Sequence, residues 1–269
     1  MRAFDYERAD LAAALAKLPL AKGDVLFCHS NLGFFGNMAG VSNSDTLCRI
    51  FLDEILERVA PGGTLAVPTF TLSFTNGEVF DPRSTPSAMG MFAEWIRRQP
   101  NAKRSCDPCF SVAAIGAKAE WLTHKVSANS YDDNSFFGRL ASCSGKILNL
   151  NFDAGSTFIH FVERKLKVPY RFDKSFVGVI RESGHERRAT STIWVRYLSD
   201  DSLEAAFEAF DGVARAEGLF VTAGLGRGQL GVISADATAD LIARTIKRRP
   251  WFLTRAERLG ISAPRIVPE

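Results

Sequence analysis

The sequence has few of the features that mark membrane-bound or secreted proteins. Its 269 residues contain no run of about 18 apolar side chains, the length that a bilayer-spanning helix requires. Acidic residues interrupt the apolar pattern at the N-terminus, which is not typical of a secretory signal. The five cysteines are scattered and odd in number, so they indicate reduced thiols and not a disulfide framework. We therefore expect a cytoplasmic protein with no membrane insertion.

Signals for a metal or for nucleic acid are equally sparse. Cys106 and Cys109 have C-x-x-C spacing, but no second cysteine pair accompanies them, so we expect no metal site. The net charge is only +3, and the basic residues are spread along the chain, with "KRR" at 247–249 late in a helical pattern. This distribution disfavours nucleic acid as a partner. A mild positive excess suits an anionic small molecule.

Two glycine-containing segments fall short of phosphate-binding fingerprints. "HSNLGFFG" at 29–36 follows an apolar strand but lacks the lysine of a P-loop, so it is either a ligand-binding loop with exposed N–H groups or a tight exit from the strand. "GLGRGQLG" at 224–231 does not match G-x-G-x-x-G, which disfavours a nucleotide-dependent oxidoreductase. We expect a turn entering an edge strand there, with Arg227 able to face a ligand.

Hydrophobic periodicity alternates between helical and extended stretches along most of the chain. This alternation predicts an α/β fold, a three-layer sandwich with a mostly parallel central sheet flanked by helices, in one domain over 1–269. From residue 176, "FVGVI" and "TSTIWVRYL" predict a C-terminal antiparallel hairpin, with the polar "RESGHERRA" as its loop. The expected helices cover 6–18 after an Asp5 cap, 44–59 behind Ser44, 87–98, 201–216 and 235–248.

A histidine and a glutamate share one face of the helix predicted after the strand at 146–152. His160 and Glu163 are three positions apart, so the carboxylate can hold the imidazole in one tautomer, as a general base requires. Such a pair also occurs on solvated helices, but apolar neighbours and the ligand-binding edge of the sheet favour a functional pair. His29 ends a buried strand at the same edge, whereas His124 and His185 lie in polar surroundings.

Several motifs in this order resemble the aminoglycoside 3-N-acetyltransferase family. They are "GDVLFCHSNLGFFG", "GGTLAVPTFT", "FDPRSTPSAMGMFAEWIRR", "RSCDPCFSVAAIGAKAEWLT", "NSFFGRLASCSGKILNLNFDAGSTFIHFVE" and "VPYRF", between about residues 20 and 250. The resemblance implies a CoA-dependent N-acyltransferase with an acyl-CoA such as acetyl-CoA as co-substrate and no metal. It also implies that His160 is the catalytic base and that Glu163 orients it.

The resemblance further implies where the ligands lie. We expect Phe70 and Asp107 to contact the amine substrate. We expect coenzyme A at His29, Ser30, Asn31, Leu32, Gly33, Thr69, Arg104, Ser111 and Ser135.

The amine acceptor is the least constrained part of this interpretation. Many antibiotic-modifying members have His or Asn where this chain has Asp107. With the basic net charge, this difference favours a nucleotide-linked amino sugar, with an aminoglycoside antibiotic as the alternative. A binding module that keeps the coenzyme loop but needs no His160 is a further alternative. The acyl chain and a possible homodimer stay open.

Overall fold

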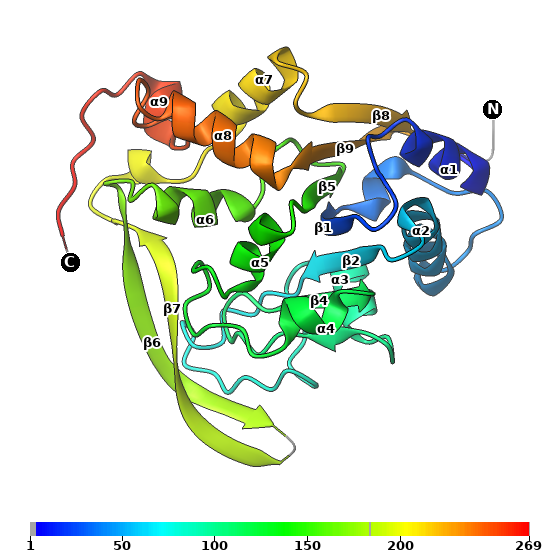
Figure 1. Ribbon diagram of the computed structural model, residues 1–269, viewed down its shortest axis with the longest axis horizontal. Helices are drawn as coiled ribbons and strands as arrows, with labels where there is room; N and C mark the ends of the chain where they lie inside the picture. The colour runs from blue at the N-terminus through cyan, green and yellow to red at the C-terminus, as the bar shows by residue number, and fades with distance from the viewer. Residues whose placement is uncertain (1–3, 183, 269) are drawn as a thin grey trace.

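The computed structural model describes residues 4–182 and 184–268, and a seven-stranded sheet lies at its centre (Figure 1). The spatial order is β3 (Lys103–Arg104), β4 (Val112–Gly116), β2 (Thr64–Pro68), β1 (Val25–Ser30), β5 (Lys146–Leu150), β9 (Gly228–Ser234) and β8 (Val221–Leu225). β1 pairs in parallel with β2 and β5, whereas β4 and β9 are antiparallel to both of their neighbours. Of the seven described strands, β4 and β9 therefore run against the other five, and the predicted mostly parallel sheet is confirmed.

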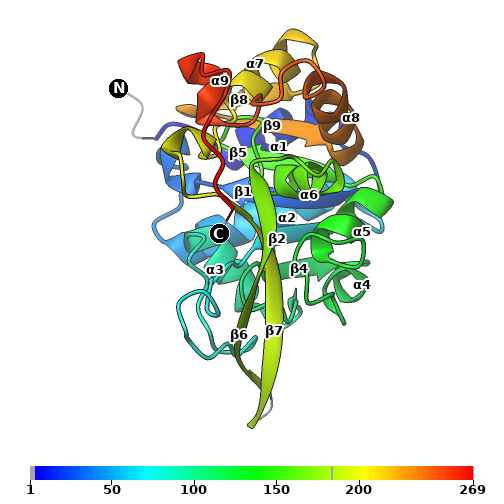
Figure 2. The ribbon, with the colours of Figure 1, turned by 90° about the vertical axis from the view of Figure 1, so that its left-hand side faces the viewer.

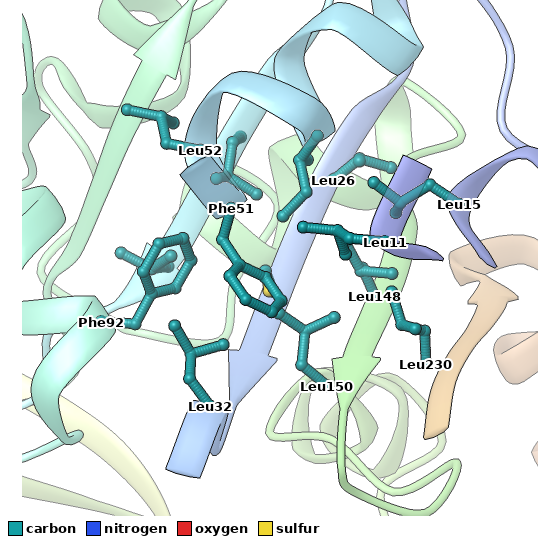
Figure 3. Packing of buried hydrophobic residues seen from close by; sticks show 14 of the residues in the cluster. Leu11, Leu15, Leu26, Leu32, Phe51, Leu52, Phe92, Leu148, Leu150 and Leu230 are labelled. Atoms are coloured by element: carbon teal, nitrogen blue, oxygen red, sulfur yellow. The ribbon is translucent and has the colours of Figure 1, made fainter. Parts of the chain in front are cut away.

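Helices cover both faces of the sheet because its central strands are apolar on both sides. In β1, Leu26 and Cys28 point into one hydrophobic layer, while Val25 and Phe27 point into the other. Figure 3 shows the first layer, where Leu26 and Leu148 of the sheet meet Phe51 of a covering helix. The strand period of two thus builds the predicted three-layer sandwich.

Within residues 4–182 and 184–268, three helices and a short 3₁₀ turn pack in the first layer, and five helices pack in the second. The first layer contains α1 (Arg8–Ala16), η1 (Leu32–Phe35), α2 (Ser44–Val59) and α3 (Met91–Arg97). The second contains α4 (Ala119–Thr123), α5 (Phe136–Ser142), α6 (Phe158–Lys165), α7 (Glu208–Ala216) and α8 (Ala235–Thr245). Figure 2 shows the sheet between these layers. Near the C-terminus, α9 (Arg255–Leu259) contacts η2 (Asp201–Leu203).

Several helix boundaries differ from those that the sequence predicts. The first helix has no Asp5 cap, because Asp5 forms an ion pair with Arg227 at 2.8 Å and the carboxylate of Asp10 accepts the N–H of Glu7 instead. Asn43, and not Ser44, caps α2 through the N–H of Thr46. The expected helices at 87–98 and 201–216 begin later, at Met91 and Glu208. Arg227, which the sequence suggests could face a ligand, is therefore paired with Asp5 in this structure.

The hairpin is longer than the sequence predicts. β6 (Arg171–Glu182) pairs with β7 (His185–Arg196) in one continuous antiparallel register, and its far end extends away from the sandwich (Figure 1). The polar "RESGHERRA" is therefore mostly strand and not loop. Opposite charges across the two strands, such as Arg181 and Glu186 at 2.5 Å, suit a solvent-exposed β-ribbon.

The turn at 226–227 also differs in its context. It connects β8 to β9, and β8 is the edge strand, whereas β9 lies inside the sheet between β5 and β8. A hairpin turn therefore replaces the expected entry into an edge strand. In the part of the chain that the structure describes, no helix is both long and apolar enough to cross a bilayer.

Candidate active site

His160 lies on α6, directly beyond the carboxyl end of β5. The β5 strand ends at Leu150, and the segment to Thr157 turns the chain into the helix, where the hydroxyl of Ser156 accepts the N–H of Phe158. Apolar side chains on the inner face of α6 pack against the second hydrophobic layer and fix the helix. This packing holds the His160 side chain 17% exposed, at the end of the sheet where open α/β folds bind ligands.

The predicted pair is formed, and two further residues complete it. His160 Nδ1 lies 2.6 Å from Glu163 Oε2, and the Tyr170 hydroxyl donates to Glu163 Oε1 at 2.8 Å. Arg171 Nε lies 3.0 Å from Glu163 Oε2, and the Glu163 side chain is fully buried. The carboxylate therefore has a partner on each oxygen, which burial of a charge requires.

Electrostatics set the protonation of this pair. Burial raises the pKa of Glu163, but the combined effect of Arg171, His160 and Tyr170 lowers it by more. The pKa of Glu163 therefore lies below its usual value, and the group is a carboxylate. Burial and then the charge of Arg171 lower the pKa of His160, against the opposing effect of Glu163. A neutral imidazole facing a carboxylate donates from Nδ1 and leaves the Nε2 lone pair free to accept a proton.

The lowered pKa of His160 gives a testable pH dependence. We expect the NMR titration midpoint of the His160 ring below its ordinary value of 6.5, and we expect Arg171→Met to raise this midpoint because the guanidinium opposes protonation. The contribution of neutral His160 to folding stability is present above pH 6.5, the ordinary value, and is lost as the pH falls through the lower pKa of the folded state. A midpoint above 6.5 in the unsubstituted protein would contradict this electrostatic picture.

A cavity of about 570 Å³ opens beside His160. Its walls come from the loops after β2 and before β4, from the segment between α4 and α5, from α6, from the base of the β6–β7 hairpin and from the segment after β7, and they are largely apolar. The lining residues are Phe70, Met89, Phe110, Tyr131, Thr157, His160, Arg171, Lys174, Phe176, Ile193, Trp194, Val195, Arg196, Leu198, Glu204 and Ala205. The size and the mixture of aromatic walls with a few polar groups suit a small-molecule ligand.

The structure places the two predicted substrate residues differently. Phe70 lines the cavity, and its ring meets that of Phe110 edge-on at 4.9 Å. Asp107 is 7% exposed and does not line the cavity; its Oδ1 accepts the N–H groups of Cys109 and Phe110, at 2.9 Å each. Burial raises the pKa of Asp107. In this structure Asp107 shapes its own loop, and its contact with substrate stays a prediction.

The predicted coenzyme residues at the end of β1 form a loop held to the neighbouring segments. The N–H of Asn31 donates to the carbonyl of Leu150, and its own carbonyl accepts from Asn151 Nδ2. Gly33 is exposed, whereas Leu32 is buried in the first hydrophobic layer (Figure 3), so Leu32 offers little surface to a ligand. Ser30 is half-buried at the end of β1.

His29 is set into the protein beside this loop. Its ring meets Phe27 edge-on at 4.7 Å, and burial lowers its pKa to about 4. Its Nε2 atom is buried and has no hydrogen-bond partner among the described residues. His29 is therefore neutral near pH 7.

Three other predicted coenzyme residues lie together in a buried network. Arg104 Nε donates to the hydroxyls of Thr69 and Ser111, at 3.2 Å each, and its terminal nitrogens donate to the carbonyls of Thr69, Pro82 and Thr85. Burial lowers the pKa of Arg104 to about 10. This network joins the end of β2 to the loop before α3. Ser135 also makes a structural contact, because its hydroxyl caps α5 by accepting the N–H of Gly138, and its contact with the coenzyme stays a prediction.

The Arg104 network predicts a structural cost when the guanidinium is removed. We expect Arg104→Met to lower the free energy of unfolding by about 2–4 kcal/mol, because several buried acceptors lose their donor. Urea unfolding measures this change, with the exposed Arg98→Met as the control, for which we expect less than about 0.5 kcal/mol. Equal stability of the two variants would show that Arg104 does not hold the loop together.

Sequence patterns do not indicate most of the cavity. Tyr170 and Arg171 stand in the "VPYRF" motif, but no local spacing connects them with Glu163. Tyr131 and Trp194 come from a loop and from β7, respectively, and their packing brings them to the cavity. No metal site accompanies them: within 4–182 and 184–268, no group of three or more His, Cys, Asp or Glu side chains could hold a metal ion.

Comparison with known proteins adds a family to this geometry. A family model described as aminoglycoside 3-N-acetyltransferase matches residues 27–247. A curated relative, aminoglycoside N(3)-acetyltransferase IV from Salmonella sp., is 28% identical over 243 residues, covering 85% of this chain and 88% of the relative.

Solved structures share the fold. AAC-IIIb in a binary complex with CoASH has a TM-score of 0.75 at 24% identity, covering 90% of this chain and 97% of that one. A mutant of AAC(3)-IVa in complex with a gentamicin has a TM-score of 0.76 at 23% identity, covering 96% and 95%. Identities this low establish the common fold alone, but the family model spans most of the sequence. The chain therefore belongs to the aminoglycoside 3-N-acetyltransferase family.

Proposed function

We propose that this protein transfers the acetyl group of acetyl-CoA to a primary amine of an aminoglycoside, with His160 as the general base. The observation that carries the proposal is an imidazole with Nδ1 held 2.6 Å from a buried carboxylate, in the wall of a cavity of about 570 Å³. Family membership supports the reaction class. The bound CoASH and gentamicin of the two fold relatives support the two ligands.

The chemistry requires a base at this position. As the amine nitrogen attacks the thioester carbonyl carbon, a C–N bond forms and the C=O electron pair moves to oxygen, while His160 Nε2 takes a proton from nitrogen. The tetrahedral intermediate then collapses, the C–S bond breaks, and the CoA thiolate leaves and receives the proton from the imidazolium. Direct transfer needs no acyl-enzyme, because holding both substrates together already removes much of the entropic barrier.

The buried partners of His160 support this cycle. Glu163 fixes the Nδ1–H tautomer and stabilises the imidazolium that forms transiently. Tyr170 and Arg171 keep Glu163 ionised by hydrogen bonding and by charge. These three residues are therefore positioning residues, and His160 alone exchanges the proton.

The loop after β1 is our proposed binding segment for the coenzyme. Its exposed backbone at Gly33 lies at the same edge of the sheet as the start of α6, where an N–H group can meet a phosphate or amide oxygen. Thr69, Arg104 and Ser111 support the neighbouring wall, since Thr69 directly precedes the cavity residue Phe70.

A nucleotide-linked amino sugar, the acceptor that the sequence favours, is the second candidate. The specific observation for it is charge: Arg171, Lys174 and Arg196 line the cavity against one carboxylate, Glu204, with Arg171 facing Glu163 and Arg196 lying 3.8 Å from Asp201. Glu204 is itself paired with Arg255 at 2.7 Å. Phosphates of a nucleotide would suit such a lining better than a polycation. We nevertheless place the aminoglycoside first, because the family description and the name of the curated relative both specify an aminoglycoside.

A panel of acceptors tests both candidates. The protein is mixed with acetyl-CoA and, separately, an aminoglycoside, a nucleotide-linked amino sugar and the free amino sugar, and release of the CoA thiol is followed. We expect the highest kcat/KM for the aminoglycoside. A higher value for the nucleotide-linked sugar would select the second candidate, and the absence of thiol release above background with every amine would contradict acetyl transfer.

A further inference from the structure

Apart from Arg171 Nε, which lies 3.0 Å from the Glu163 carboxylate, two polar atoms in residues that line the cavity beside His160 have no hydrogen-bond partner in the described part of the chain. They are the Tyr131 hydroxyl and the Trp194 indole Nε1, and both atoms are buried. An unpaired buried polar group costs about 1–3 kcal/mol, and native proteins contain few of them. Both residues line the same cavity, so a ligand bound there is the candidate partner for both atoms.

Tyr131 is held rigidly next to His160. Its ring stacks on Phe137 at 5.2 Å with an interplanar angle of 14°, and it meets the His160 ring edge-on at 6.0 Å. The side chain is fully buried, so surrounding atoms restrict its rotation. Burial also raises the pKa of Tyr131 well above 10, so the hydroxyl keeps its proton and can donate a hydrogen bond.

We propose that the Tyr131 hydroxyl donates a hydrogen bond to the acyl oxygen of the thioester, and that the Trp194 N–H donates to an oxygen of the acceptor sugar. This inference rests on the proposed function. The acyl oxygen gains negative charge when the amine attacks the carbonyl carbon, and a fixed donor stabilises that charge without transferring its proton. Tyr131 takes this role because its ring contacts His160, the base that accepts the proton of the attacking amine.

Removing the hydroxyl alone tests the role of Tyr131. We expect Tyr131→Phe to lower kcat for acetyl transfer by about 10²-fold with little change in KM, as for the loss of one oxyanion donor. The melting temperature should not fall, because the ring packing remains and the lost hydroxyl has no partner among the described residues. A merely structural role would instead lower stability.

Tyr6→Phe is the matched control. The Tyr6 hydroxyl is also buried without a partner among the described residues, but its ring packs against Phe35 and Phe51 in the opposite hydrophobic layer. We expect its kcat to equal that of the parent protein. For Trp194→Phe we expect the KM of the acceptor to rise about tenfold with a smaller change in kcat, since this donor contacts the acceptor.

A measurement without acceptor separates this inference from the proposed function. Calorimetry compares the affinities for acetyl-CoA and CoA, and we expect an advantage of about fivefold for acetyl-CoA in the parent protein that Tyr131→Phe loses. An unchanged preference together with kcat within threefold of the parent would overturn the role of Tyr131. Binding of acetyl-CoA without acetylation of any amine would contradict the proposed function alone, whereas failure to bind acetyl-CoA would contradict both.

Discussion

Replacing His160 with alanine is expected to lower kcat for acetyl transfer by about 10²- to 10⁴-fold, the range for loss of a general base. The amine would then have to lose its proton to water, because no other imidazole lines the cavity among the described residues. Steady-state measurement of thiol release at saturating substrates gives the effect. KM should change little, since the base acts mainly in the transition state.

His124→Ala is the control for this substitution. His124 ends α4, its side chain is 59% exposed, and it lies 3.4 Å from Glu120. Its removal should leave kcat unchanged. If His160→Ala kept kcat within threefold of the parent, another group would have to accept the proton, and the assignment of His160 would be wrong.

The second large effect concerns stability. We expect Glu163→Ala to lower the free energy of unfolding by about 3–5 kcal/mol, because the 7% exposed side chain of Arg171 would keep its buried charge without an anion. The stabilisation by Glu163 is present above the unfolded-state pKa of the carboxyl group and is lost as the pH falls, because its folded-state pKa is lowered. Urea unfolding at neutral pH measures the change.

Two further variants delimit this effect. Glu120→Ala removes a carboxylate that is 62% exposed, so we expect a change within about 0.5 kcal/mol. Glu163→Gln keeps the volume of the side chain but can favour the wrong imidazole tautomer, and we expect it to lower kcat by at least about 10²-fold. A Glu163→Ala protein as stable as the parent would show that Arg171 finds another partner.

Local spacing explains why the core of the site is predictable. His160 and Glu163 are neighbours on one helix, so their contact depends only on helix geometry and on the prediction that the segment is helical. Phe70 follows a buried strand at the ligand edge for the same kind of reason. The apolar pattern of β1 likewise contains the information for a sheet covered on both faces.

Elements whose geometry depends on distant partners are predicted less well. The polar segment "RESGHERRA" has little apolar periodicity, yet it continues β6 and β7 because cross-strand hydrogen bonds and ion pairs replace burial. Asp5 has the chemistry of a helix cap but pairs with Arg227, which is 222 positions away in sequence. The local helix propensity of the N-terminal segment therefore could not predict that contact.

The sequence by itself determined the layered α/β fold, the strand ends that carry the ligand edge, and the pairing of His160 with Glu163, because each follows from periodicity within a short segment. The tertiary structure alone decided that Arg171 lies against the Glu163 carboxylate and that Arg104 donates its hydrogen bonds to backbone carbonyls. It also decided that Tyr131 and Trp194 line one cavity. Those relations join distant segments, and burial sets their strength, since it removes the water that would otherwise satisfy each charge and donor.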